Sequence, residues 1–297
     1  DLTGFTQYCV ERSWSPVFYS VHREQRDALL AEGWNSIEVG SEMVVDPRVW
    51  KTTGKKWQDV RTAINKAKRD GITDVQSTFL ESPLEVREQI EDISEEWAQL
   101  KALPEMKFTL GGVEELRDPR VRLLYAVDAD GRVLGVTSWL PTWRDGRVIG
   151  WTLDFMRHRT DSPNGIMEFL IARMAERLRD EGAADPERAA EFMSLSAAPL
   201  AGMNPERDNA GEGGAPAGEG TQVLQHALQI VADWMEPAYG FHSLFNFKRK
   251  FQPTEAPVYV CYPDPAALPQ IGLAVVRAYV PSVTPAEVAG MLSTLRS

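Results

Sequence analysis

A carboxylate and a guanidinium stand three residues apart, at Asp154 and Arg157, in the segment LDFMRHRTDSPNGIMEFL. Asn164 and Gly165 follow, directly before an apolar pattern with helical spacing. A helix N-terminus presents backbone N–H groups that attract anions, and a glycine there lets a ligand approach the backbone closely. This joint between a strand and a helix is therefore our first candidate for an active site.

The elements that must position these residues can be read from the same stretch. Alternating apolar residues predict a strand over 148–155, and the spacing after residue 163 predicts a helix with one face in the core. Ser162 suits the N-cap of that helix and Pro163 its first position. On a regular strand Asp154 and Arg157 would face opposite ways, so joint action requires a bend near Met156.

Two basic stretches stand out in a chain whose net charge is −11. Residues 51–69 hold seven basic residues and one acidic residue, and on a helical wheel Lys55, Lys66 and Arg69 fall opposite the apolar stripe. A polyanion such as RNA, or an anionic lipid head group, would suit that face, although a solvated helix face is the alternative. In the second stretch, 241–253, Lys248 falls among aromatic residues and Lys250 points away from them. A lysine on an aromatic face either extends its amine to solvent or meets an anion.

Length and composition exclude several classes of protein. With 297 residues and 43% hydrophobic residues, the chain is long and apolar enough for a folded core. No apolar run approaches the roughly 18–20 residues that a membrane-spanning helix needs. The two cysteines, Cys9 and Cys261, match no metal-ligand spacing. A negative net charge argues against non-specific nucleic-acid binding by the surface as a whole.

The segment 121–143 predicts a β-hairpin around the turn Asp128–Gly131, and the strand at 148–155 should pair next to it. An acidic amphipathic helix over 83–101 precedes these strands, and another helix follows them. Together they predict the front half of an acyltransferase-like α/β unit.

Several blocks of the sequence resemble the phosphatidylglycerol lysyltransferase family, the multiple peptide resistance factors. Asp154 and Arg157 match its D-x-M-R signature, followed by an N-G-x-M pattern. The blocks GSEMVVD, GKKWQDVRTAINKAKRDG, ISEEW, SAAPLAG and FKRKFQP, the last followed by YV, come in the family's order. The resemblance implies a bacterial transferase domain at the cytoplasmic face of the plasma membrane, belonging to a protein whose transmembrane portion is absent from this chain.

The resemblance also implies the fold and the domain organisation. We expect an α/β (α+β) protein with tandem GNAT-type acyltransferase units and mainly antiparallel, twisted sheets. Residues 1–71 would form an incomplete first unit with a basic connecting helix at 55–70, and residues 72–297 a second unit carrying the active site. The chain departs from the family pattern by starting inside the first unit and by a Gly- and Ala-rich insertion before Thr221.

In this family the domain moves an amino acid from aminoacyl-tRNA to a hydroxyl of a membrane lipid such as phosphatidylglycerol, which lowers the negative charge of the membrane. The ester is already activated, so no metal or cofactor is needed, only positioning, proton transfer and oxyanion stabilisation. Asp154 would hold the α-ammonium group or act as base, and Arg157 would bind the lipid phosphate or the oxyanion. A purely structural ion pair between them is the alternative. Substrate binding is assigned to Asn164, Gly165, Lys248 and Lys250, and tRNA binding to Lys55, Lys66 and Arg69.

Three other functions remain open at this point. An acetyl-CoA-dependent N-acetyltransferase would need a Gly-rich pyrophosphate loop, whereas RHRTDSPNG holds one glycine. A peptidoglycan-bridge aminoacyltransferase would share the donor but use a muropeptide acceptor. A non-catalytic lipid or RNA sensor would need none of the proposed chemistry. His158 is expected to be a residue at the rim of the site, not the base.

Overall fold

The structure is a computed structural model that describes residues 2–100, 108, 111–199 and 241–279. It divides into two compact units, and the insertion before Thr221 lies outside the described residues. The first unit comprises residues 1–42, 197–244 and 255–297, and the second comprises residues 43–196 and 245–254. Every residue that the sequence assigned to the site lies in the second unit. The expected boundary between two acyltransferase units after residue 71 stays a prediction.

The first unit builds its own small core from strands and short helices. Its elements are α1 (Leu2–Val10), β1 (Phe18–Val21), α2 (Arg23–Ala31), most of β2 (Asn35–Val45), β8 (Thr254–Tyr262) and α8 (Leu268–Tyr279). The strand order is β1-β8-β2, and β1 pairs antiparallel with β8. Ile37 and Val39 pack with Val258 and Val260, so alternate residues of β2 and β8 form a shared apolar face.

The second unit is an antiparallel meander followed by one parallel strand. Strands β3 (Thr73–Ser77), β4 (Arg122–Val127), β5 (Val133–Arg144) and β6 (Arg147–His158) pair in sequence, and β7 (Phe192–Pro199) runs parallel to β6. At the β4–β5 turn Gly131 has φ +80°, and Asp128 Oδ1 accepts a 3.0 Å hydrogen bond from the backbone N–H of Asp130. The mixed α/β fold with a mainly antiparallel sheet is confirmed.

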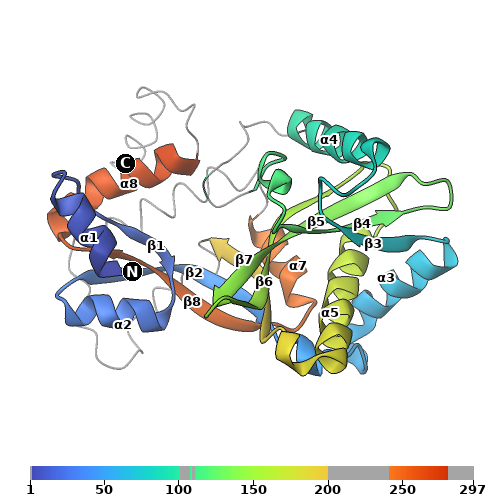
Figure 1. The fold of residues 1–297 in the computed structure, drawn as a ribbon, viewed down its shortest axis with the longest axis horizontal. Coiled ribbons are helices and arrows are strands. Elements are labelled where there is room, and N and C mark those ends of the chain that lie inside the picture. The colour runs from blue at the N-terminus through green and yellow to red at the C-terminus, as the bar shows by residue number, and fades with distance from the viewer. Residues whose placement is uncertain (1, 101–107, 109–110, 200–240, 280–297) are drawn as a thin grey trace. The chain divides into compact units, whose positions relative to one another are not determined.

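Helices cover both faces of this sheet (Figure 1). On one face lie α3 (Gln58–Arg69) and α5 (Ile166–Ala184), which share a core with Leu124 and Ala126 of β4. On the other face lies α4 (Leu84–Gln99), whose Ile90 and Ile93 pack with Leu123 and Tyr125. Successive side chains of β4 therefore point alternately into two separate cores, as expected for a pleated strand that is buried on both faces.

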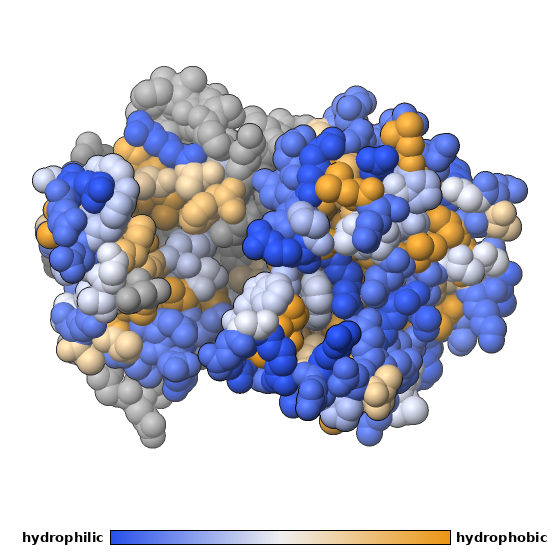
Figure 2. All heavy atoms as spheres, viewed as in Figure 1, coloured by the Kyte–Doolittle hydropathy of each residue, from blue (hydrophilic) through white to orange (hydrophobic). Residues whose placement is uncertain are grey.

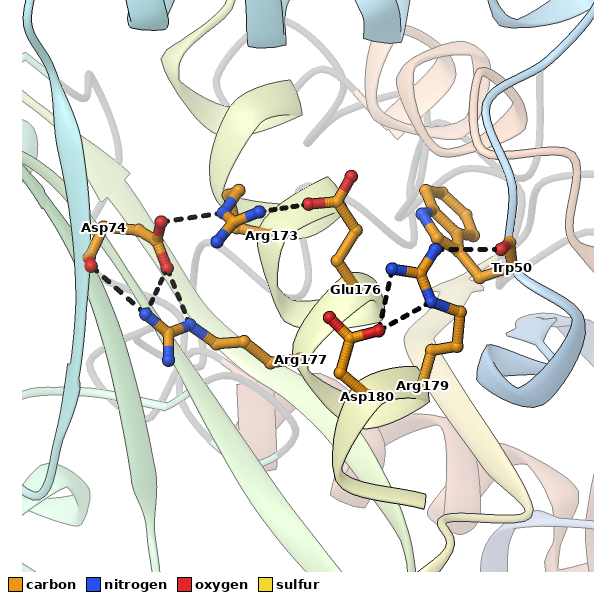
Figure 3. Close-up of polar contacts among 7 residues, drawn as sticks. All are labelled: Trp50, Asp74, Arg173, Glu176, Arg177, Arg179 and Asp180. Carbon is orange, nitrogen blue, oxygen red and sulfur yellow. Dashed lines mark hydrogen bonds and ion pairs between the residues drawn. The ribbon is translucent and has the colours of Figure 1, made fainter. Parts of the chain in front are cut away.

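Ion pairs tie α5 to the outermost strand of the meander (Figure 3). The Asp74 carboxylate of β3, with 8% of the side chain exposed, accepts from Arg173 Nε at 2.7 Å and from Arg177 Nε at 2.6 Å. Arg173 also contacts Glu176, while Arg179 pairs with Asp180 and donates to the backbone oxygen of Trp50 at 3.4 Å. A nearly buried carboxylate held by two guanidinium groups fixes α5 against β3.

Two further observations concern the whole described chain. Cys9 and Cys261 are free and buried. Within the described ranges no helix combines the length and the apolar character that crossing a membrane requires.

Candidate functional site

A β-bulge in β6 positions Asp154. Thr137 of β5 pairs with Met156, but Trp139 pairs with Leu153, so Asp154 and Phe155 both lie opposite Ser138. The Ser138 hydroxyl accepts a 3.1 Å hydrogen bond from the backbone N–H of Phe155, which replaces a missing bond of the ladder. The strand thus contains the irregularity that joint action of Asp154 and Arg157 requires, located at residues 154–155, directly before Met156.

The bulge changes which residues share a face of the sheet. Leu153 and Met156 both pack toward α3 and α5, although they are three residues apart. Phe155 packs on the opposite side, in the core beneath α4. Arg157 contacts α4, and Asp154 contacts Gly111 in the segment after α4. Asp154 and Arg157 therefore lie on the same side of the sheet, where a regular strand would have separated them.

Asp154 is a half-buried carboxylate with a raised pKa. The pKa of Asp154 is raised from 3.8 to about 6, chiefly by burial. A hydrogen bond from the backbone N–H of Gly111 opposes this rise, and the nearby Glu115 carboxylate contributes to it. A carboxylate that binds its proton near neutral pH can accept and return a proton during a reaction. This combination of burial, position and proton affinity makes Asp154 the chemically most distinctive group in the unit.

Arg157 is held by α4. Its side chain is 5% exposed, and its guanidinium donates to the Ser94 hydroxyl and, at 3.3 Å, to the Ser94 backbone oxygen. The guanidinium carbon also lies 4.1 Å from the ring centroid of Trp97 and 4.5 Å from that of Phe155. In the described part of the chain Asp154 and Arg157 form no ion pair with each other. The geometry therefore does not support the alternative of a structural ion pair between them.

Lys248 lies where β7 leaves β6. The parallel ladder ends at Thr152 and Ser194 within the described part of both strands, and the hydroxyl of Ser196 donates to the backbone oxygen of Leu153. Ser196 has φ +66°, a conformation that non-glycine residues seldom adopt. The buried Lys248 amine, on α7 (Phe241–Arg249), donates to the backbone oxygen of Ser196 at 3.4 Å. These contacts connect Lys248 with the residue adjoining Asp154.

Lys250 belongs to a different contact. Its amine forms a 2.8 Å ion pair with Glu168 in the first turn of α5 and lies 5.5 Å from the ring centroid of Phe247. Lys248 and Lys250, two residues apart, therefore contact different parts of the unit. A ligand that binds the Lys250 amine must compete with the Glu168 carboxylate.

The start of α5 differs from the expectation. The helix begins at Ile166 with Gly165 as N-cap, so the predicted N-cap at Ser162 and first helical position at Pro163 are wrong. The Ser162 hydroxyl donates instead to the backbone oxygen of Leu134. Gly165 has φ +94°, and a Cβ there would lie 3.0 Å from Cβ of Ala63. Close packing against α3 therefore decides where α5 starts.

Asn164 and Gly165 lie away from Asp154. Their segment contacts Leu134, whereas Asp154 lies opposite Ser138, four residues further along β5. Four residues of a strand span about 13 Å. Asn164 is exposed, and His158 is exposed with Nδ1 2.7 Å from the backbone oxygen of Arg159. The structure thus places Asp154 and Arg157 on one side of the sheet and connects Lys248 through Ser196 with the residue beside Asp154. Asn164 and Gly165 are set apart from Asp154.

The basic stretch forms a short 3-10 turn (Lys55–Trp57) and α3. Its apolar side, with Val60, Ala63 and Ala67, is buried, and the surface over α3 is mostly hydrophilic (Figure 2). Lys55 and Arg69 are exposed, and the partly exposed Lys66 pairs with Asp70 at 2.5 Å. Arg61 instead donates to the backbone oxygens of Thr52 and Gly54, each at 2.5 Å, and so shapes the loop before the helix.

Sequence reasoning missed Gly111 and Glu115, which lie near Asp154, and Ser94 and Trp97, which contact Arg157. The consecutive glycines of LGGVEE are the signal that was available, since a glycine pair often marks a close approach of the backbone. In the described ranges no group of three His, Cys, Asp or Glu side chains is placed to hold a metal ion.

Comparisons with known proteins agree on one family. A family model described as phosphatidylglycerol lysyltransferase, C-terminal, matches residues 1–262. An uncharacterized protein of Corynebacterium glutamicum is 37% identical over 276 residues, which cover 93% of this chain and 32% of that protein. The phosphatidylglycerol lysyltransferase of Bacillus subtilis is 26% identical over 271 residues, covering 88% and 28%. The chain thus spans about a third or less of the length of these relatives.

A solved structure agrees with the fold. The C-terminal domain of a putative lysylphosphatidylglycerol synthetase from Agrobacterium fabrum superposes with a TM-score of 0.72 at 20% identity. The match covers 95% of this chain and 78% of that one. At this identity the likeness concerns the fold alone.

Proposed function

The chain belongs to the family described as phosphatidylglycerol lysyltransferase, C-terminal, and from this membership we propose that it transfers an amino acid from aminoacyl-tRNA to a hydroxyl of a membrane lipid such as phosphatidylglycerol. The observation that carries the proposal is Asp154, a half-buried carboxylate at a β-bulge whose pKa is raised to about 6. Because aminoacyl-tRNA is a cytoplasmic molecule, the domain would work at the cytoplasmic face of the plasma membrane.

In the proposed reaction Asp154 acts as general base. The lipid hydroxyl gives its proton to the carboxylate, and its oxygen forms a bond with the carbonyl carbon of the aminoacyl ester. When the tetrahedral intermediate collapses, the bond between that carbon and the ribose oxygen of the tRNA breaks. Asp154 returns the proton to the ribose oxygen, so one ester replaces another without a net change in protons or electrons.

Positive charge near Asp154 would stabilise the anionic parts of this reaction. Arg157, oriented by Ser94 and Trp97, supplies a fixed guanidinium for the lipid phosphate or for the oxyanion. Lys248 and Lys250 are assigned to phosphates of the tRNA acceptor end. Since Lys248 contacts Ser196 and Lys250 contacts Glu168, substrate binding would exchange these contacts for phosphates. Asn164 and Gly165, set apart from Asp154, would bind a more distant part of a substrate.

The basic face of α3 and of the 3-10 turn before it is the proposed contact for the body of the tRNA. Lys55, Lys66 and Arg69 lie opposite the buried apolar side of this segment, where they can contact phosphates without disturbing the core. Such contacts release counterions, so the affinity should fall steeply as salt is added.

The test is transfer of label from charged tRNA to lipid. The chain is incubated with tRNAs charged with different labelled amino acids and with vesicles that contain phosphatidylglycerol, and the label in the organic phase is measured. We expect lipid-bound label with wild type and none with Asp154→Asn. Asp161→Asn is the matched control, because Asp161 is an exposed carboxylate that pairs with Arg132 at 2.8 Å. Folded protein that transfers no amino acid to lipid, or that labels a muropeptide in a parallel reaction instead, would contradict the proposal.

A further inference from the structure

The segment after α4 brings a backbone N–H group against the carboxylate of Asp154. A Cβ built on Gly111 would lie 1.8 Å from Asp154 Oδ2 and 2.6 Å from Cγ, distances that no real side chain allows. The Gly111 N–H also donates a hydrogen bond to this carboxylate. A side chain at position 111 therefore fits only if the Asp154 carboxylate moves from its place.

The neighbouring residues keep this contact in place. Glu115 Oε2 accepts a 2.8 Å hydrogen bond from the N–H of Gly112, which closes a tight turn at the start of the short helix Glu115–Arg117. Leu116 of this helix is fully buried, in the same core as Phe155. The turn is thus anchored on one side by a buried side chain and presents Gly111 on the other.

We propose that Gly111 is a positioning residue for the transfer reaction, which fixes the orientation of the Asp154 carboxylate through its backbone N–H and through close contact that only glycine permits. The inference rests on the proposed function of Asp154 and adds the residue that orients its carboxylate. The β-bulge places Asp154 on the correct side of the sheet, but a carboxylate can still rotate about its side-chain bonds. An N–H donor at one oxygen removes this freedom and directs the other lone pairs at the substrate.

The test compares two adjacent glycines with the same substitution. In Gly111→Ala the new methyl group must push the Asp154 carboxylate aside, which a flexible side chain can do without unfolding the protein. Gly112→Ala keeps the backbone N–H that donates to Glu115, and among the described residues its new Cβ meets the end of the Glu115 side chain, at 3.1 Å. This variant is therefore the matched control. We expect transfer to fall about 100-fold in Gly111→Ala, as for other misplacements of about 1 Å, and less than about threefold in Gly112→Ala. Equal activity of the two variants would overturn the proposal.

A second measurement requires no activity. The stability cost of Gly111→Ala is determined by urea unfolding in the wild-type background and again in Asp154→Ala. If the added methyl group meets the Asp154 carboxylate, the cost disappears when that carboxylate is absent. A cost of the same size in both backgrounds would show that Gly111 packs for an unrelated reason. Absence of transfer in wild type would instead refute the proposed function, while this stability cycle would still decide the contact.

Discussion

Replacing Asp154 by asparagine should stabilise the protein while abolishing its proposed activity. Burial raises the pKa of Asp154 from 3.8 to about 6, so the folded state holds the carboxylate in its ionised form at a cost. One pKa unit corresponds to about 1.4 kcal/mol, so the interval between these values corresponds to about 3 kcal/mol at most. Asparagine keeps an oxygen for the Gly111 N–H and carries no charge. We therefore expect a gain of about 1–3 kcal/mol in the free energy of unfolding at pH 8.

The pH dependence of this gain has a definite sign. A carboxyl group whose pKa is raised on folding binds its proton more tightly in the folded state. Below pH 3.8 Asp154 is protonated in both states, so wild type has no free-energy penalty from its ionisation. The penalty grows between pH 3.8 and about 6 and is complete above pH 6. The advantage of Asp154→Asn over wild type should therefore be largest at pH 8, shrink through pH 6 and be nearly absent at pH 4.

Urea unfolding of both proteins at several pH values measures this difference directly. Asp161→Asn serves as control, because pairing with Arg132 lowers the pKa of Asp161 and its replacement should give no gain at pH 8. An Asp154→Asn variant less stable than wild type at pH 8 would refute the reasoning, as would a gain independent of pH. A loss of stability would mean that the carboxylate is stabilised by its surroundings, as in a structural ion pair. A gain independent of pH would mean that it does not come from removing the ionised form.

Three further predictions follow from the same geometry. The value of kcat/KM for transfer should fall as the pH drops through about 6, because the base must be ionised, and Asp161→Asn should keep the same pH profile. A wild-type profile without a fall near pH 6 would contradict this. The triple substitution of Lys55, Lys66 and Arg69 by alanine should weaken tRNA binding and leave folding nearly unchanged. The slope of log affinity against log salt should fall by about one unit for each phosphate that is no longer neutralised. Unchanged affinity across a salt series would mean that this face is an ordinary solvated surface. Asp74→Asn should cost about 2–3 kcal/mol in urea unfolding, since it leaves two arginines of α5 without their carboxylate (Figure 3), and a cost no larger than that of Asp70→Asn, whose carboxylate is more exposed, would contradict this.

Much of the second unit was accessible from periodicity alone. The hairpin around Asp128–Gly131 and the helix at 84–99 follow from local patterns, because a turn or an amphipathic helix depends mainly on residues close in the sequence. Asp154 and Arg157 were also identified from the sequence as residues with chemistry to offer. The basic side of α3 was predicted because helical spacing separates it from Val60 and Ala67.

What the sequence could not decide were the contacts between distant segments. The local signals for a helix start at Ser162 were overridden by packing of Gly165 on Ala63, about a hundred positions earlier in the chain. Lys250 looked available for phosphate, but α7 brings it to Glu168 of α5. In both cases a local preference of about 1 kcal/mol competes with tertiary contacts of equal or greater value.

The arrangement of Asp154 is the clearest case. The sequence supplies the carboxylate and the strand that carries it, and an ideal strand would have directed it away from Arg157. The bulge opposite Ser138 and the approach of Gly111 depend on strand register and on a turn more than forty residues away. Strand register and close backbone contacts arise only when the sheet and its helices pack together, so the chemistry was visible in the sequence while its geometry was decided by the tertiary structure.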